Sequence, residues 1–122
     1  MPILNIEIVG DMAPASTAHL ASAIAEMAGA ALGSRPGGTW VRLRTLPASH
    51  YAENGPPLAP DELPVFVTIL HREPPAGPAL EAEVAALTDG LARVLDRSRE
   101  RVHLEYLAAA AGRQSFGGRL VA

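Results

Sequence analysis

The chain opens with Met1-Pro2-Ile3-Leu4-Asn5-Ile6-Glu7-Ile8, the stretch around which the rest of the sequence is organised. Ile6 and Ile8 fall on one face of the alternating pattern and Asn5 and Glu7 on the other, which predicts a strand buried on one side. A proline at position 2 favours removal of the initiator methionine. The mature chain is therefore expected to begin with the secondary amine of Pro2, held in place by a strand.

An amine held at the start of a strand can serve as a catalytic group. An ordinary α-amino group titrates at about 8, and burial among apolar side chains or a nearby cation lowers its pKa. Such an amine can act as a general base near neutral pH. The alternative is that Pro2 is an edge-strand residue with no N–H to leave unpaired. These eight residues alone favour that plainer alternative.

Composition limits the possible classes of protein. With 122 residues, 48% hydrophobic and 4% aromatic, the chain can bury one core made of Leu, Val, Ile and Ala. A net charge of −3 argues against nucleic acid, which needs a basic surface. There are no cysteines, and the four histidines lack metal-ligand spacing, so neither a metal nor another cofactor is expected. No segment predicts a membrane span or a signal peptide, and a soluble cytoplasmic protein is expected.

The first half of the chain predicts a helix and a second strand. Ser16 or Thr17 is the expected helix cap, and Gly33 the expected end. The helix carries one face of small apolar side chains at helical spacing: Leu20, Ala21, Ile24, Met27, Ala28, Ala31 and Leu32. Residues 39–46 then alternate as a strand. On it Val41 and Leu43 point one way, and Trp40, Arg42 and Arg44 point the other.

The second half repeats the first. Residues 64–70 predict a strand, residues 81–95 a helix, and residues 101–107 a closing strand that Gly117-Gly118 is expected to end. An offset of 62 carries Pro2 to Pro64 and Gly55 to Gly117. The sequence therefore predicts a single domain, 1–122, made of two β-α-β repeats, 2–55 and 64–118, joined by a Pro-rich linker, 56–63.

Two such repeats predict an α/β fold. A helix crossover favours parallel pairing of its two strands with a right-handed connection. The expected result is a four-stranded mixed sheet with both helices on one face. The other face stays bare, and packing against further copies of the chain in a closed oligomer would cover it.

In combination, these features resemble the tautomerase superfamily, whose founding member is 4-oxalocrotonate tautomerase. The resemblance rests on Pro2 before a strand, on two β-α-β copies of about sixty residues, and on the stretches Arg97 to Leu104 and Phe116 to Leu120. The doubled length is similar to macrophage migration inhibitory factor, 5-carboxymethyl-2-hydroxymuconate isomerase, malonate semialdehyde decarboxylase and cis-3-chloroacrylic acid dehalogenase. The resemblance implies a homotrimer, with Pro2 as the catalytic residue in a pocket at subunit contacts.

The resemblance also implies an arginine that binds a substrate carboxylate. Phe66-Val67-Thr68-Ile69-Leu70-His71-Arg72-Glu73 resembles the third strand of the dehalogenase, where an arginine after Leu-His binds substrate. Arg72 takes that position, although Glu73 can equally be its ion-pair partner. The dehalogenase's second arginine would fall at Pro75 and its helix histidine near Ala28, and its water-activating glutamate has no match among residues 114–116. These departures speak against dehalogenation.

Other pocket positions follow from the same resemblance. Arg35 lies where macrophage migration inhibitory factor has a pocket lysine. His103 and Glu105 lie where it has substrate-contacting Tyr and Asn, or else form an interface pair. Tyr51 matches an aromatic residue that lines the pocket of the small tautomerases, and Trp40 replaces their strand arginine. Arg42 and Arg44 are expected to be solvated or to pair with Glu53 or a neighbouring chain.

Three functions remain open on the sequence. The first is a cofactor-free tautomerase for a 2-oxo acid or 2-hydroxydienoate, with Pro2 as general base and Arg72, helped by Arg35, holding the carboxylate. The second is hydration with dehalogenation, or decarboxylation, in which Glu53 or Glu105 would activate water. The third is a non-catalytic trimeric scaffold. No membrane or nucleic-acid partner is expected.

Overall fold

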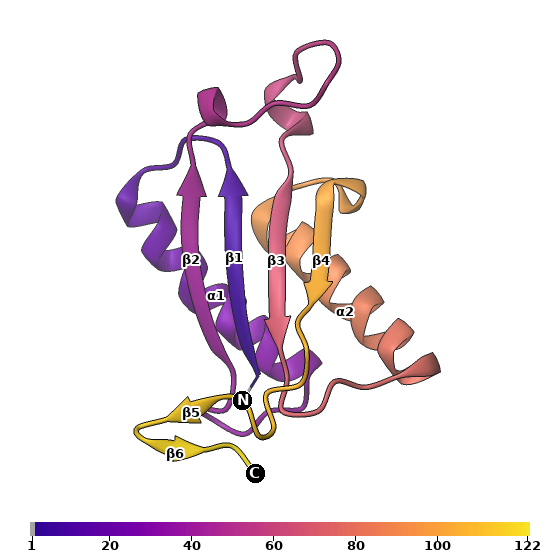
Figure 1. The fold of residues 1–122 in the computed structure, drawn as a ribbon. Helices are drawn as coiled ribbons and strands as arrows, with labels where there is room; N and C mark the ends of the chain where they lie inside the picture. The colour runs from indigo at the N-terminus through magenta and orange to yellow at the C-terminus, as the bar shows by residue number, and fades with distance from the viewer. Residues whose placement is uncertain (1) are drawn as a thin grey trace.

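The computed structural model describes residues 2–122 and shows one four-stranded sheet with strand order β2-β1-β3-β4 (Figure 1). Its strands are β1 (Ile3–Val9), β2 (Trp40–Leu46), β3 (Val65–Leu70) and β4 (Val102–Tyr106). β1 pairs with β2, and β3 with β4, in parallel, whereas β1 and β3 pair antiparallel. The expected removal of Met1 concerns a residue outside this range.

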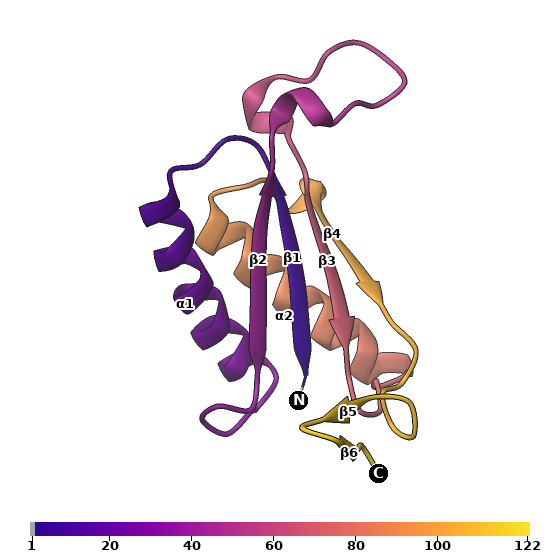
Figure 2. The same cartoon turned by 60° about the vertical axis from the view of Figure 1, so that its left-hand side comes forward.

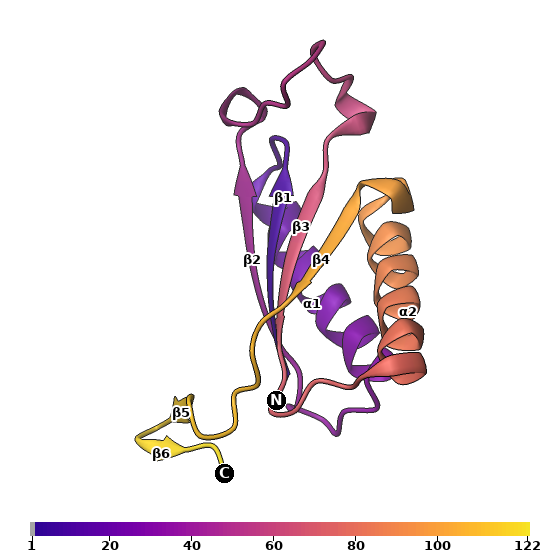
Figure 3. The ribbon, with the colours of Figure 1, turned by 45° about the vertical axis from the view of Figure 1, so that its right-hand side comes forward.

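Two helices, α1 (Pro14–Ala31) and α2 (Gly77–Leu95), cover one face of the sheet, and the opposite face is open (Figure 3). This confirms the predicted mixed sheet with both helices on one side. The core lies between the two layers because each strand turns alternate apolar side chains toward the helices. Its members are Leu4, Ile6, Ile8, Ile24, Ala28, Val65, Val67, Ile69, Leu87, Leu91 and Val102.

Both helices begin earlier than the sequence predicted. α1 starts at Pro14, and the expected cap at Ser16 or Thr17 is wrong, because Thr17 lies inside the helix and its Oγ1 donates to the Ala13 carbonyl at 2.9 Å. α2 starts at Gly77, not at Glu81. Each helix has a proline in its first turn, where the fixed φ suits a helix and the missing N–H has no partner to lose.

The C-terminal segment forms a hairpin that the sequence did not predict. Its strands β5 (Ser115–Phe116) and β6 (Arg119–Leu120) are joined by Gly117 and Gly118. These glycines have φ of 57° and 84°, as a tight hairpin turn requires. The expectation that these glycines end the closing strand is therefore wrong, because β4 already stops at Tyr106. The hairpin lies at the end of the sheet where β1 begins (Figures 1 and 3).

The opposite end of the sheet carries the long connection between β2 and β3 (Figures 1 and 2). This connection includes two short 3₁₀ turns, η1 (Ala48–His50) and η2 (Pro60–Glu62), and a third, η3 (Arg99–Arg101), leads into β4. Neither helix in the described part of the chain is long and apolar enough to cross a membrane. One end of the sheet therefore carries the start of β1 and the C-terminal hairpin, and the opposite end carries the long connection between β2 and β3 (Figure 1).

Candidate active site

Pro2 is held at the start of the sheet. It is buried, and its carbonyl accepts the backbone N–H of Trp40 at 3.0 Å, which extends the β1–β2 ladder beyond Ile3. The Trp40 ring, 47% exposed, packs edge-on against Phe116 of the hairpin at 5.0 Å. Pro2 is therefore fixed by the backbone and lies at the end of the sheet that carries the exposed ring of Trp40.

The two predicted arginines lie at the same end of the sheet as Pro2. Arg72 comes two residues after Leu70, which pairs with Ile3 across β3 and β1. Arg35 lies in the turn between α1 and β2, shortly before the first residue of β2. Both side chains are exposed. Arg72 Nε donates to the backbone oxygen of Ala122 at 2.6 Å, so the C-terminal segment lies against this arginine.

Tyr51 and His103 lie at the opposite end of the sheet, on its open face. The ring of Phe66 is 5.8 Å from that of Tyr51 and 5.5 Å from that of His103. Glu105 lies nearer the middle of this face, opposite Thr68. Phe66 pairs with Glu7, five residues beyond Pro2 along β1. At the rise of a β-strand this places Phe66, and with it Tyr51 and His103, about 17 Å from Pro2 along the strand direction.

The six predicted residues thus fall into two groups that one chain does not bring together. Pro2, Arg35 and Arg72 form the group at the N-terminal end of β1. Tyr51, His103 and Glu105 form the group on the open face. A single pocket containing both groups would require side chains from different copies of the chain.

Glu53, one of the two carboxylates considered for water activation, is engaged in a network. The Tyr51 hydroxyl donates to its Oε2 at 2.6 Å, and Arg101 Nη1 lies 3.2 Å from the same oxygen. Arg101 Nη2 lies 3.6 Å from Glu62. The hydrogen bond to Glu53, with burial and the nearby negative charge, raises the pKa of Tyr51. This network fastens the long loop to the start of β4.

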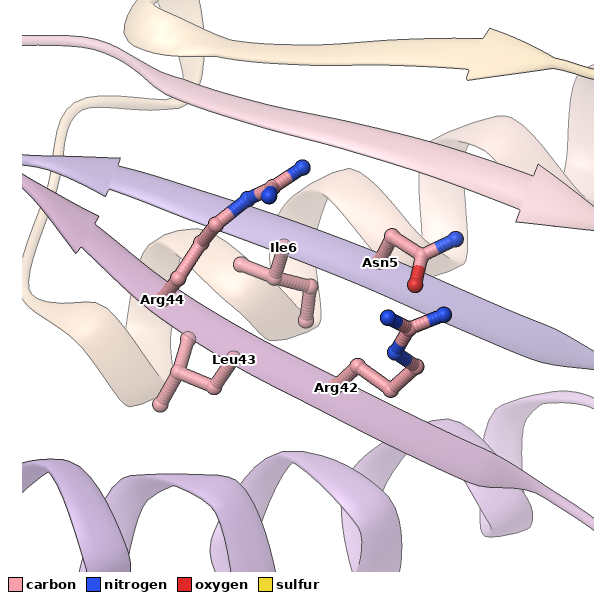
Figure 4. Close-up of a pocket in the computed structure, with 5 residues that line it drawn as sticks. All are labelled: Asn5, Ile6, Arg42, Leu43 and Arg44. Carbon is pink, nitrogen blue, oxygen red and sulfur yellow. The ribbon is translucent and has the colours of Figure 1, made fainter.

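Arg42 and Arg44 line a shallow pocket in the open face with Asn5, Ile6 and Leu43 (Figure 4). Arg42 extends toward Asn5, its partner across the β1–β2 ladder. Arg44 Nε lies 3.7 Å from Glu7 Oε2, and the Arg44 side chain is 77% exposed. These arginines therefore have a place on the open face of the sheet, away from Pro2.

Three polar residues near Pro2 were not singled out from the sequence. His71 Nε2 lies 2.8 Å from Glu83 Oε2, and the Tyr106 hydroxyl donates to the same oxygen at 2.6 Å. The sequence holds one signal that could have identified Glu83. It precedes Leu87 by four residues and Leu91 by eight, which places it on the buried face of α2. A carboxylate on a buried helix face needs polar partners.

Across residues 2–122 no group of three His, Asp or Glu side chains is arranged to hold a metal ion. The chemistry available at the N-terminal end of β1 is that of an amine, should Met1 be removed, and of guanidinium groups. The first can take up a proton, and the second can bind a carboxylate.

No protein-family model matches the chain, and no curated protein sequence matches it. Several solved structures do match the chain. A fused 4-OT trimer, R7, aligns with a TM-score of 0.78 and 20% identity over 97% of this chain and 94% of its own. Macrophage migration inhibitory factor of Toxoplasma gondii aligns at 0.70 and 15%, over 97% and 98%. Malonate semialdehyde decarboxylase aligns at 0.67 and 15%, over 96% and 92%. The chain therefore has the fold of these proteins.

Proposed function

We propose, from this tautomerase-type fold, that the chain is an isomerase that moves a proton between the enol and keto forms of a 2-oxo acid or 2-hydroxydienoate. The observation that carries the proposal is the arrangement at one end of the sheet. A buried Pro2 directly precedes β1 there, and Arg72 follows β3, the strand that pairs with β1. Removal of Met1 is part of the proposal, because only then is Pro2 an amine.

Each group has one role in the proposed reaction. The Pro2 nitrogen takes the O–H proton of the enol, and the electrons of that bond form the carbonyl as the C=C bond opens. The carbon end of the former double bond then takes the proton back from Pro2, so the amine is regenerated. Arg72 holds the carboxylate and stabilises charge on the oxygen, helped by Arg35. To do so, Arg72 must exchange its contact with Ala122 for the substrate.

The proposed assembly is a homotrimer. The fused 4-OT proteins of the same fold are trimers. Neighbouring copies can supply Tyr51, His103 and Glu105 to the group that contains Pro2. Within one chain, Tyr51 and His103 lie about 17 Å from Pro2 along the strand direction, and Glu105 lies nearer the middle of the sheet. The binding of a small carboxylate, the absence of nucleic-acid and membrane partners, and a cytoplasmic location remain predictions.

Decarboxylation or hydration is the second candidate, because malonate semialdehyde decarboxylase shares the fold. In that chemistry a protonated Pro2 would act as an acid while a carboxylate activates water. Glu53 is poorly suited, since Tyr51 and Arg101 already engage its oxygen. Glu105 is exposed on the open face and is the better choice. A non-catalytic scaffold is the third candidate.

The test of Pro2 is ketonisation of phenylenolpyruvate and 2-hydroxymuconate, with the intact mass measured to establish loss of Met1. We expect Pro2→Ala to lower kcat/KM by about 100-fold or more, because a positioned general base contributes that much. The trimer, measured by sedimentation, should persist in the variant. Equal trace rates in both proteins would remove Pro2 from the mechanism and favour the scaffold.

The test of Arg72 is the substitution Arg72→Ala. Loss of a charged hydrogen bond to the carboxylate should raise KM by about 10- to 100-fold. Arg93→Ala is the matched control, because Arg93 is exposed on α2. An Arg72 variant as active as the Arg93 control would show that the substrate carboxylate is bound elsewhere.

A further inference from the structure

Three polar side chains meet on the helix side of the sheet, at the end where Pro2 lies. His71 follows β3, Glu83 belongs to α2, and Tyr106 is the last residue of β4. One carboxylate oxygen of Glu83 contacts both His71 Nε2, at 2.8 Å, and the Tyr106 hydroxyl, at 2.6 Å. The side chains of His71 and Glu83 are only 14% and 15% exposed. A single carboxylate of α2 therefore contacts both the last residue of β4 and the residue that follows β3.

The contacts fix the orientation of the imidazole. Burial, together with the hydrogen bond and charge of Glu83, raises the pKa of Tyr106 far above its usual range, so its hydroxyl is a donor at neutral pH. The tautomer of His71 that carries its proton on Nε2 is the one that can donate to a carboxylate oxygen of Glu83. The His71 and Tyr106 rings are also stacked, 9° apart in plane and 6.0 Å between centroids.

This anchored histidine is the immediate neighbour of the proposed site. The antiparallel register pairs Ile3 with Leu70, and one further step along it brings Pro2 opposite His71. Arg72 is the next residue of the chain. Any movement of the His71 side chain would therefore be transmitted to the backbone that carries Arg72.

The backbone of His71 and Arg72 is also held by hydrogen bonds to the C-terminal part of the chain. The carbonyl of His71 accepts the N–H of Ala110 at 2.9 Å, and that of Arg72 accepts the N–H of Ala111 at 3.2 Å. These bonds fasten the segment to the C-terminal part of the chain. The contact with Glu83 is what fastens it to α2.

We infer that His71, held by Glu83 and Tyr106, is a positioning residue that fixes Arg72 relative to Pro2. Its effect on catalysis rests on the function proposed above, whereas its effect on Arg72 does not. A cluster that only joined α2 to the sheet would change stability when disrupted, and would leave both substrate affinity and the mobility of Arg72 unchanged.

Kinetics of Glu83→Gln and Tyr106→Phe give the first test. We expect KM for the carboxylate substrate to rise about tenfold, because a misplaced Arg72 holds the carboxylate less tightly, and kcat to fall as well, because Arg72 also stabilises charge on the oxygen. Asp89→Asn is the matched control, since this carboxylate also lies on α2 and contacts Arg99 Nε at 2.9 Å, but both side chains are exposed. A fall in kcat at constant KM would overturn the inference.

NMR relaxation of the Arg72 Nε–H group gives a second test that needs no turnover. We expect its order to decrease in Glu83→Gln and to stay unchanged in Asp89→Asn. Unchanged order in Glu83→Gln overturns the inference whatever the kinetics. Loosening of Arg72 in a protein that turns over no substrate would support the positioning role and reject the proposed function. Tyr106→Phe, which removes one hydroxyl, serves if Glu83→Gln does not fold.

Discussion

Arg97 is a residue whose role is structural, although it begins one of the stretches that resemble the small tautomerases. Its guanidinium donates to the carbonyl of Leu63 at 2.7 Å and to that of Val9 at 3.1 Å. Val9 ends β1 and Leu63 lies just before β3, so one side chain joins the end of one strand to the approach of the next. Burial lowers the pKa of Arg97, yet an arginine remains charged at neutral pH.

Replacing Arg97 by methionine should therefore destabilise the fold. Arg97→Met keeps most of the aliphatic stem but leaves two carbonyls without their donor, and we expect a loss of about 2 kcal/mol in the free energy of unfolding in urea. Arg99→Met is the control, because the exposed pair of Arg99 and Asp89 contributes less than about 1 kcal/mol. Equal stability of the two variants would contradict this account of Arg97.

At the scale of elements, the contact between the two helices depends on a glycine. Gly90 of α2 is buried, and a Cβ added there would lie 2.3 Å from Met27 Sδ and 2.9 Å from Met27 Cγ, both in α1. Moving only the terminal methyl of Met27 would not relieve this clash. Gly90 therefore sets how closely α1 and α2 approach each other.

We predict opposite effects for two Gly→Ala substitutions in these helices. Gly90→Ala should lower stability by about 1–3 kcal/mol through overpacking, despite the better helix propensity of alanine. Gly29→Ala, in α1, should raise it by up to about 1 kcal/mol, since nothing lies within 4 Å of the added Cβ. Thermal unfolding measures both. Stabilisation by Gly90→Ala would show that the helices have room to separate.

At the scale of the whole molecule, the open face of the sheet sets the proposed assembly. Phe66, 37% exposed, lies on it between Glu7 of β1 and His103 of β4. Thr68 lies between Asn5 and Glu105, near its centre. A face that mixes exposed apolar and charged side chains in this way suits burial against further copies of the chain.

Thr68→Arg should convert the proposed trimer to monomers. Within one chain the new guanidinium would lie opposite Glu105, a favourable cross-strand pair, so the fold of the monomer should survive. Buried between copies, the same charge would be costly. Sedimentation velocity measures the change, with Ala85→Arg on the exposed side of α2 as control. A Thr68→Arg protein that remains a trimer would place the subunit contacts elsewhere.

The accuracy of the sequence-based prediction depended on the range of the interactions involved. The alternation of Ile6 and Ile8 with Asn5 and Glu7 identified the inward and outward faces of β1, because side chains of a strand alternate whatever its neighbours are. The presence of both helices was likewise predictable from the helical spacing of their apolar residues. Both helices start earlier than predicted, because each has a proline in its first turn, where its fixed φ suits a helix. The hairpin at Gly117-Gly118 was missed because its strands have two residues each.

The sequence by itself determined the fold class, the two β-α-β units and the sheet with one bare face, because these depend on local periodicity and short connections. The tertiary structure decided that Arg72 lies at the same end of the sheet as Pro2, while Tyr51 and His103 lie at the other end. It also brought His71, Glu83 and Tyr106 together. Such neighbours come from the strand register and from helix packing, and those long-range contacts leave no periodic pattern in a single sequence.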